Sequence, residues 1–374
     1  MAVKLHLFNP ENDLALAANL DHYTPPKAAV DLRRSGALLP MWYADAGDRV
    51  LCHGVNARWF DTVREAFGID VDVFGHEPSD EYDLRPWGWS RAARTDFLNE
   101  GFAPAMLPDD ETLDCLRMLS HRRIAAEIGA EVALAVGSGR VVASAREMRE
   151  IGEVESALDT GAIYVKAPWS SSGRGVLSSA SAGHERTLRR ASEIIAAQGS
   201  VMVEEAFDKA IDFARIYECE GGRCRALSTS VFVTDSRGAY TGNLLADEPT
   251  RRSRVEAFVD AALLSACDEA LRRAVEEKIA PYYNGIIGVD MMASADGRIM
   301  PVVEINLRCT MGYAANRFAD RYLAPGATGV FAVKPRQAFA VTDEYKTKDG
   351  RLYAGRLGLV PPGAPFVIWA AVDY

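Results

Sequence analysis

Oxygen-bearing side chains gather late in the chain, on two apolar segments joined by a short loop. In GIIGVDMMASADGRIMPVVEINLR, Asp290 lies in the first segment, and Glu304 and Asn306 lie in the second. Residues i and i+2 of a strand point to the same side, so Glu304 and Asn306 share a face. Carboxylates and an amide carbonyl are the hard oxygen ligands that Mg²⁺ takes beside substrate phosphates. The pattern predicts a magnesium site; the alternative for Asp290 alone is a buried, hydrogen-bonded aspartate.

The length of the connecting loop decides whether these three side chains can meet. A two-residue turn at Asp296-Gly297 would pair residue 290 with residue 303 and put Glu304 on the opposite face. A three-residue loop, or a bulge at Gly297, returns Asp290 and Glu304 to one face. A metal site therefore requires the odd-length loop or the bulge.

A second candidate site lies in IYVKAPWSSSGRGV, residues 163–176. Lys166 ends a β-branched segment, and the loop from Ser170 to Gly175 is rich in small residues. Glycine allows close approach of the backbone, and successive N–H groups in such a loop can cradle an anion. The lysine adds a point charge suited to phosphate oxygens. The stretch predicts a phosphate site, with a flexible surface hairpin as the alternative; it is not a Walker A loop, because the lysine precedes the glycines.

Composition limits the partners. The 374 residues are 48% apolar and 25% charged, which is typical of a soluble chain of two or three domains. A formal charge of −10 argues against a nucleic-acid partner. The chain shows neither a signal peptide nor an apolar run near the roughly 20 residues of a membrane helix, so we expect a cytoplasmic protein without a membrane partner. Cys219 and Cys224 flank a Gly-Gly hairpin, and in that compartment we expect two thiols.

The order of expected elements predicts an α/β unit followed by mixed α and β structure. Short strands over 3–8 and 70–74 alternate with helices up to about residue 118. The next expected element is a helix ended by Gly129, followed by strands over 132–136 and 141–143 and a helix over 145–158. A helix over 185–199 and a strand over 200–207 come after the Lys166 stretch. Strands follow over 212–220, 223–234 and 239–246, and then one long helix from Ser253 to about Ile279.

Three stretches together resemble the ATP-grasp superfamily. They are IYVKAPWSSSGRGV, then VMVEE, then GVDMM…DG…VVEINLR, and the resemblance covers roughly residues 119–320. It implies a mixed α/β and α+β protein in which two α+β subdomains clamp ATP, preceded by an N-terminal Rossmann-like α/β domain. We expect that domain over 1–118, a small subdomain with a lid loop over 119–205, a large subdomain with the metal site over 206–330, and C-terminal strands completing the core over 331–374.

The resemblance also implies roles for particular residues around the nucleotide. Lys166 would contact the ATP phosphates, together with an arginine, Arg122 or its rival Arg123, where the family commonly has a second lysine. The lid over the phosphates would comprise Ser170, Ser171, Ser172, Gly173 and Gly175. Adenine would meet Glu204 and the backbone near Ala206. The ribose would bind Asp212, with Glu205 and Asp208 as rivals.

The same resemblance implies the metal ligands and the reaction. Asp290, Glu304 and Asn306 would hold two Mg²⁺ ions, which Mn²⁺ could replace, with Glu304 bridging them. Arg308 would face the γ-phosphate or the acyl phosphate and, with Lys166, act in catalysis. The reaction would be an ADP-forming ligation, most often carbon–nitrogen: a small-molecule carboxylate becomes an acyl phosphate, which an amine or thiol attacks. The alternatives are an ATP-grasp phosphotransferase and a non-catalytic nucleotide-binding regulatory module. A homodimer is the default assembly.

Two further polar groups have no assigned role. The segment FNPENDLALA follows the carboxyl end of the first strand, where open α/β sheets bind ligands. Its Glu11, Asn12 and Asp13 could line an acceptor site, or form a turn and a helix cap. Arg251, Arg252 and Arg254 could guide an anionic substrate, although a solvated helix start is the simpler interpretation.

Overall fold

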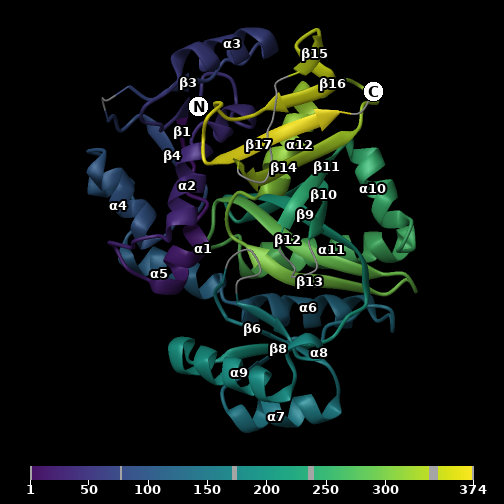
Figure 1. The fold of residues 1–374 in the computed structure, drawn as a ribbon. Helices are drawn as coiled ribbons and strands as arrows, with labels where there is room; N and C mark the ends of the chain where they lie inside the picture. The colour runs from purple at the N-terminus through teal and green to yellow at the C-terminus, as the bar shows by residue number, and fades with distance from the viewer. Residues whose placement is uncertain (1, 76–77, 171–174, 235–239, 337–343, 373–374) are drawn as a thin grey trace.

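The computed structural model describes residues 2–75, 78–170, 175–234, 240–336 and 344–372. Three β-sheets organise this part of the chain (Figure 1). Among the described residues, no helix combines the length and the apolar character needed to cross a bilayer.

The N-terminal unit is built on a parallel four-stranded sheet in the order β3-β2-β1-β4. Its strands are β1 (Val3–Leu7), β2 (Arg49–Val50), β3 (Asp72–Val73) and β4 (Tyr82–Pro86). The connecting and flanking helices are α1 (Asn12–Ala18), α2 (Lys27–Ser35), η1 (Leu39–Trp42), α3 (Ala57–Phe67), α4 (Arg91–Asn99), η2 (Pro104–Met106) and α5 (Asp110–Leu119). A parallel sheet with helical crossovers is the expected Rossmann-like arrangement, and the carboxyl end of β1 leads directly into α1.

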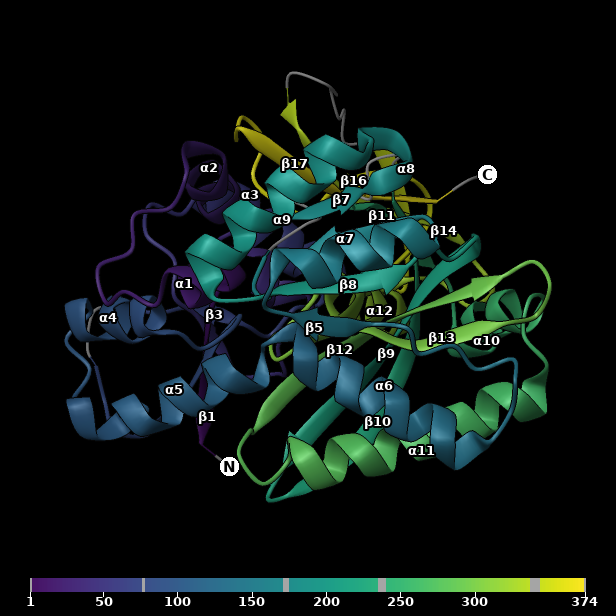
Figure 2. The same ribbon diagram turned by 90° about the horizontal axis from the view of Figure 1, so that it is seen from below.

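A small antiparallel sheet carries the Lys166 strand. Its order is β5-β8-β6-β7, from β5 (Arg146–Met148), β6 (Ile163–Lys166), β7 (Val176–Ser178) and β8 (Val201–Glu205). The helices α7 (Ile151–Thr160), α8 (Ser179–Ala182) and α9 (His184–Gln198) belong to this unit, and α7 and α9 cover the sheet at the bottom of Figure 1 and in the view from below in Figure 2. Val154, Val165, Ala191 and Val203 are among its buried core residues.

The large sheet has nine strands in the order β13-β12-β9-β10-β11-β14-β17-β16-β15. They are β9 (Lys209–Glu220), β10 (Arg223–Thr234), β11 (Tyr240–Leu245), β12 (Gly285–Ser294), β13 (Ile299–Asn306), β14 (Gly329–Pro335), β15 (Glu344–Lys348), β16 (Arg351–Gly358) and β17 (Phe366–Val372). The predicted metal hairpin β12–β13 forms one edge, and the C-terminal strands continue the same sheet. The helices packed with this sheet are α6 (Arg122–Val136), α10 (Glu248–Glu256), α11 (Ala261–Lys278) and α12 (Met311–Tyr322).

Three expected helices differ from the structure. The helix expected over 145–158 begins only at Ile151, as α7, and Arg146–Met148 form strand β5 instead. The strand predicted over 132–136 is the last turn of α6, which passes through Gly129 and ends at Gly137 in the left-handed region (φ 64°). Gly129 lies on the buried face of α6, next to Val302, so it serves packing rather than termination. The single helix from Ser253 is instead two helices. The side chain of Asp247 caps α10 and that of Asp260 caps α11, by accepting hydrogen bonds from backbone N–H groups.

The Gly221-Gly222 hairpin is confirmed, whereas the expectation of two thiols beside it is wrong. Both glycines have positive φ, and the turn sets Cys219 directly opposite Cys224 on β9 and β10. The structure joins these two cysteines in a disulfide. Facing cysteines in adjacent strands have the proximity that such a bond requires.

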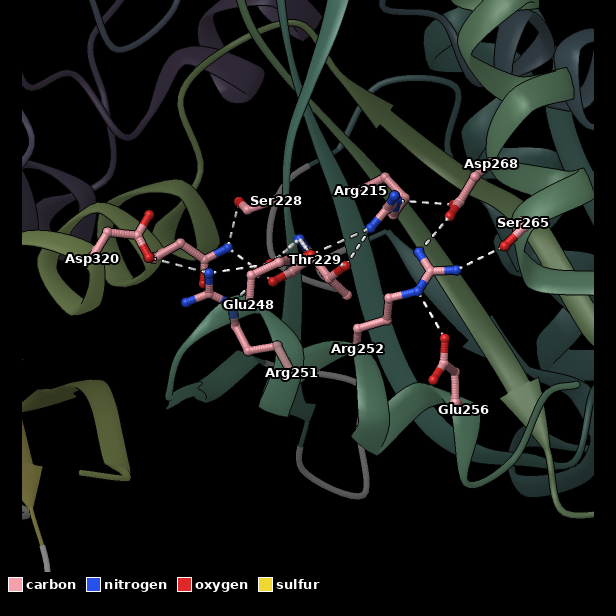
Figure 3. Close-up of polar contacts among 11 residues, drawn as sticks. Arg215, Ser228, Thr229, Glu248, Arg251, Arg252, Glu256, Ser265, Asp268 and Asp320 are labelled. Carbon is pink, nitrogen blue, oxygen red and sulfur yellow. Dashed lines mark hydrogen bonds and ion pairs between the residues drawn. The ribbon is translucent and has the colours of Figure 1, made fainter. Parts of the chain in front are cut away.

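Arg251 and Arg252 neither guide a substrate nor form a solvated helix start. Arg251 is 0% exposed and donates to the carbonyl of Ala246 (2.5 Å) and to Glu248 and Asp320. Arg252 donates to Glu256, Ser265 and Asp268. Figure 3 shows the resulting network, in which Asp268 also pairs with Arg215 of β9. The two arginines therefore tie α10 to α11, to α12 and to the large sheet.

We predict that Arg251→Ala destabilises the protein by about 3 kcal/mol, because it removes a fully buried guanidinium and leaves the carbonyl of Ala246, Glu248 and Asp320 without this donor. The matched change Arg273→Ala breaks an ion pair whose arginine side chain is 73% exposed. An exposed pair of this kind contributes less than about 1 kcal/mol. Urea unfolding of both variants measures the difference; equal losses would contradict the structural role of the network.

Candidate active site

The hairpin β12–β13 places the predicted metal ligands on one face. Ser294 N–H donates to the carbonyl of Arg298 (3.0 Å), which closes a three-residue loop with Gly297 at φ 85°. The expected odd-length loop is thus confirmed. Farther along, Met292 pairs with Met300, whereas Asp290 pairs directly with Glu304. That irregularity shifts the register by an even number of residues, so it leaves Asp290 and Glu304 facing the same side.

Asp290, Glu304 and Asn306 are electrostatically coupled. Asn306 Nδ2 donates to Asp290 Oδ2 (3.3 Å). Burial and, next, the neighbouring charge of Glu304 raise the pKa of Asp290 to about 7, against the opposing effects of Arg308 and Asn306. Asp212 adds to the same repulsion from β9, where the register puts it on the Asp290 face. This excess of negative charge fits a divalent cation.

The donor set suits Mg²⁺ rather than a metal held entirely by protein. Within the described ranges, no group of three or more His, Cys, Asp or Glu side chains gathers to hold a metal ion. The hairpin instead offers two carboxylates and one amide. Mg²⁺ commonly takes one or two carboxylates and fills its other positions with phosphate and water oxygens.

Arg122 connects these carboxylates to the base of the Ser/Gly loop. Its Nη2 donates to Glu304 Oε1 (2.6 Å), and its Nη1 donates to Ser170 Oγ (2.8 Å) and the carbonyl of Ala167 (2.5 Å). Arg122 is 7% exposed, so these bonds form in a desolvated environment. The structure therefore brings Arg122 and Ser170 beside the predicted metal ligands. His121 caps the same helix, because its Nδ1 accepts a hydrogen bond from the backbone N–H of the neighbouring Arg123 (3.0 Å).

The base of the predicted lid is closed by backbone contacts. Ala167 N–H donates to the carbonyl of Gly175 (2.9 Å). A Cβ at Gly175 would lie 2.7 Å from the Cβ of Ser170, so a side chain cannot fit there. The predicted lid residues Ser171, Ser172 and Gly173 lie outside the described residues.

Lys166 and Glu204 form a buried ion pair between β6 and β8. The loop that follows Lys166 also contacts the start of α6, because the backbone N–H of Arg122 donates to the carbonyl of Pro168 (3.2 Å). Ala206 N–H donates to the carbonyl of Ala162 (3.0 Å), so this N–H group is already used within the protein. The three candidates for the ribose differ in setting: Asp212 accepts hydrogen bonds from Lys209 and Thr234, whereas Glu205 and Asp208 are exposed.

Arg308 binds the N-terminal unit to the hairpin. Its Nε and Nη2 donate to the two carboxylate oxygens of Asp13 (2.8 and 2.7 Å), and Nη2 also donates to Asn306 Oδ1 (2.8 Å). Burial alone would lower the pKa of Arg308, but Asp13, Glu304 and Asp290 raise it above its usual range. A cavity of about 20 Å³ opens beside this contact, lined by residues that include Asp13, Trp169, Ser170, Glu304 and Asn306.

The matches between this chain and known proteins come from comparison of three-dimensional structures. No protein-family model and no curated protein sequence matches it. The N5-carboxyaminoimidazole synthetase of Staphylococcus aureus, solved with ADP, superposes with a TM-score of 0.50 at 10% identity, over 99% of this chain and 93% of that chain. Campylobacter jejuni biotin carboxylase, in a β,γ-ATP complex, gives 0.51 at 11% identity, over 100% and 88%. The biotin carboxylase domain of the Hydrogenobacter thermophilus 2-oxoglutarate carboxylase, with MgADP, ADP and bicarbonate, gives 0.50 at 12%, over 100% and 87%.

The chain has the ATP-grasp fold. The likeness extends over nearly the whole chain, including the N-terminal α/β unit and the C-terminal strands. In this ATP-grasp fold the small sheet carries Lys166 and the large sheet carries the β12–β13 hairpin.

Sequence reasoning missed His121 and Trp169, which pack against each other beside the candidate site. The ring of Trp169 packs edge-on against His121 (centroids 4.6 Å apart) and beneath the guanidinium of Arg117 (3.8 Å). Trp169 Nε1 also donates to the carbonyl of Arg117 (2.9 Å). Because Trp169 precedes Ser170 and His121 precedes Arg122, this contact fixes both ends of the Arg122–Ser170 bond. A tryptophan inside the quoted loop and a histidine at a helix start were the available clues.

We predict that His121 makes stability depend on pH. Burial lowers the pKa of His121 to about 4, against the opposing charge of Glu147. Since the unfolded histidine titrates near 6.5, the unfolded state binds the extra proton first, and stability is lost as pH falls from about 6.5 toward 4. His121→Asn should remove about 2 kcal/mol of the loss between pH 7 and pH 5, as measured by urea unfolding.

The same substitution at the exposed His184 is the matched control and should leave the pH dependence of the wild-type protein unchanged. If His121→Asn and wild type lost stability in parallel, the buried neutral imidazole would not be the cause.

Proposed function

We propose that the protein is an ATP-dependent, ADP-forming ligase. It activates a small-molecule carboxylate and joins it to an amine or a thiol, and we favour the amine, which gives a carbon–nitrogen bond. The carrying observation is the placement of Asp290 directly opposite Glu304, with Asn306 on the same face, within an ATP-grasp fold. The neighbours support the class of reaction: they include a carboxyaminoimidazole synthetase and biotin carboxylases, solved with adenine nucleotides.

The protein groups divide between metal and phosphate. In this proposal Asp290, Glu304 and Asn306 hold Mg²⁺, two ions in the full arrangement, and Mn²⁺ could take the same place. The bound metal would neutralise phosphate charge and keep the γ-phosphate in line for attack. Arg122 and Lys166, which now pair with Glu304 and Glu204, supply the cations for the phosphate oxygens. The predicted lid, whose residues 171–174 lie outside the described residues, would cover them and exclude water.

The remaining assignments follow the fold. Glu204 and the backbone around Ala206 would meet the adenine, and Asp212 would hold the ribose. The N-terminal domain (1–118), the small subdomain (119–205), the large subdomain (206–330) and the C-terminal strands (331–374) remain our proposed boundaries. We place the enzyme in the cytoplasm and take a homodimer as its assembly.

The chemistry proceeds in two displacements. An oxygen of the substrate carboxylate attacks the γ-phosphorus, the bond to the ADP oxygen breaks, and an acyl phosphate forms. The amine or thiol then attacks the acyl carbon, phosphate leaves, and the nucleophile loses its proton. Arg308 is the cation placed to stabilise the charge that moves between these oxygens. Positioning and charge neutralisation account for most of the rate, since phosphoryl transfer asks little covalent chemistry of the protein.

The test is Mg²⁺-dependent ATP consumption with pools of carboxylates and amines. ADP and free phosphate that appear when both acceptors are present support the ligase. ADP without free phosphate would replace it by a phosphotransferase, and nucleotide binding without turnover by a regulatory module.

We predict that Asp290→Asn lowers Mg²⁺-dependent ATP turnover on the order of 10²-fold, because it removes a charge that acts on the reacting phosphates. Asp296→Asn, at the exposed tip of the same hairpin, is the matched control and should retain turnover. Steady-state rates at saturating ATP check both variants. Similar rates for wild type and Asp290→Asn would remove Asp290 from the proposed metal site.

A further inference from the structure

The hydrogen bonds of Arg308 leave its guanidinium with little capacity for another anion. An arginine has five N–H donors. Asp13 takes two of them, Asn306 Oδ1 takes a third, and the carbonyl of Cys309 takes a fourth (3.0 Å from Nη1). One N–H therefore remains for a phosphate oxygen, whereas bidentate binding of a phosphate needs two.

Asp13 is held in place by its own scaffold as well as by Arg308. Glu11, two residues before Asp13, is 6% exposed and accepts a hydrogen bond from Arg33 (2.7 Å). Arg33 also donates to Asp96 (2.8 Å). On the other side, Asn9 Nδ2 donates to the carbonyl of Gly88 (2.9 Å). The carboxylate of Asp13 thus reaches Arg308, 295 positions away in the sequence, from the first turn of α1.

The contact between Asp13 and Arg308 joins a carboxylate to a guanidinium, and the substrate of the proposed ligase also carries a carboxylate. Asp13 presents both carboxylate oxygens to the Nε and Nη2 edge of Arg308, which is the fork that any carboxylate recognises. Its side chain is 15% exposed and borders the small cavity that also touches Glu304 and Asn306. The carboxylate of an incoming substrate can therefore replace that of Asp13 on the Arg308 guanidinium when the Asp13 side chain rotates away.

We propose that Asp13 is a positioning residue that withholds Arg308 from the γ-phosphate until the carboxylate of the acceptor displaces it, since an acceptor oxygen that takes one of the freed N–H groups leaves two for the phosphate. This inference rests on the proposed ligase function and adds a means of making ATP consumption depend on the acceptor. Without Asp13, two further donors of Arg308 are free, three in all, and the guanidinium can stabilise attack by water. In that uncoupled reaction a water oxygen bonds to the γ-phosphorus, the bond to ADP breaks, and the water proton leaves with phosphate or solvent.

The test measures Mg·ATP hydrolysis by the full-length protein with no acceptor added. Asp13→Asn should increase the rate on the order of tenfold, which corresponds to about 1.4 kcal/mol in the barrier. Asp13→Ser, which lacks the carboxylate altogether, should do the same and serves if the first variant folds poorly. Asp72→Asn, which breaks an exposed pair with Arg64 in the same N-terminal unit, should keep the wild-type rate.

A double variant separates positioning from a structural role. If the gain acts through Arg308, Asp13→Asn combined with Arg308→Lys should lose it. A purely structural Asp13 would give slower hydrolysis on substitution, and an unchanged or lower rate in a variant that still binds Mg·ATP by calorimetry overturns the inference. Failure of wild type and variants alike to bind Mg·ATP would overturn the proposed function as well.

Discussion

Ion pairs between side chains on different elements of the fold determine the arrangement of the candidate site. Lys166 pairs with Glu204, Arg122 with Glu304, and Arg308 with Asp13. These side chains are largely buried, and removing charges from water costs several kcal/mol per ion. Such pairs add little net stability, so function is the better reason for them. The proposed ligand is itself a paired set of charges: its phosphates can take the cations, and its metal can take the carboxylates.

The fold explains why these charges can meet although they are far apart in the sequence. The small sheet presents Lys166 and the base of the Ser/Gly loop, the edge hairpin of the large sheet presents Glu304, and the N-terminal unit presents Asp13. Arg122 lies at the start of α6, which packs beside β13 and joins the small sheet to the large one. Apolar packing between Trp169 and His121 then fixes the angle at which the loop and α6 approach each other.

The local pattern of the chain was sufficient to predict the metal hairpin. Period-two spacing put Glu304 and Asn306 on one face, and the requirement that Asp290 join them predicted the three-residue loop that the structure contains. Long-range pairing was not accessible in the same way: the bond between Asp13 and Arg308 depends on how the N-terminal unit docks on the sheet. The helix errors have a local cause, since Gly129 can end a helix or allow close packing and only the tertiary structure decides. Arg251 resembled a surface residue because its burial depends on contacts outside α10, with the carbonyl of Ala246 and with Asp320 of α12.

The most direct test of the central claim is to locate a metal ion. Crystals grown with a non-hydrolysable ATP analogue and Mn²⁺ in place of Mg²⁺ would give an anomalous signal from the ion. The account predicts a peak between the side-chain oxygens of Asp290 and Glu304, with the triphosphate next to Lys166 and Arg122. A peak elsewhere, or a nucleotide bound with its phosphates away from this hairpin, would contradict it.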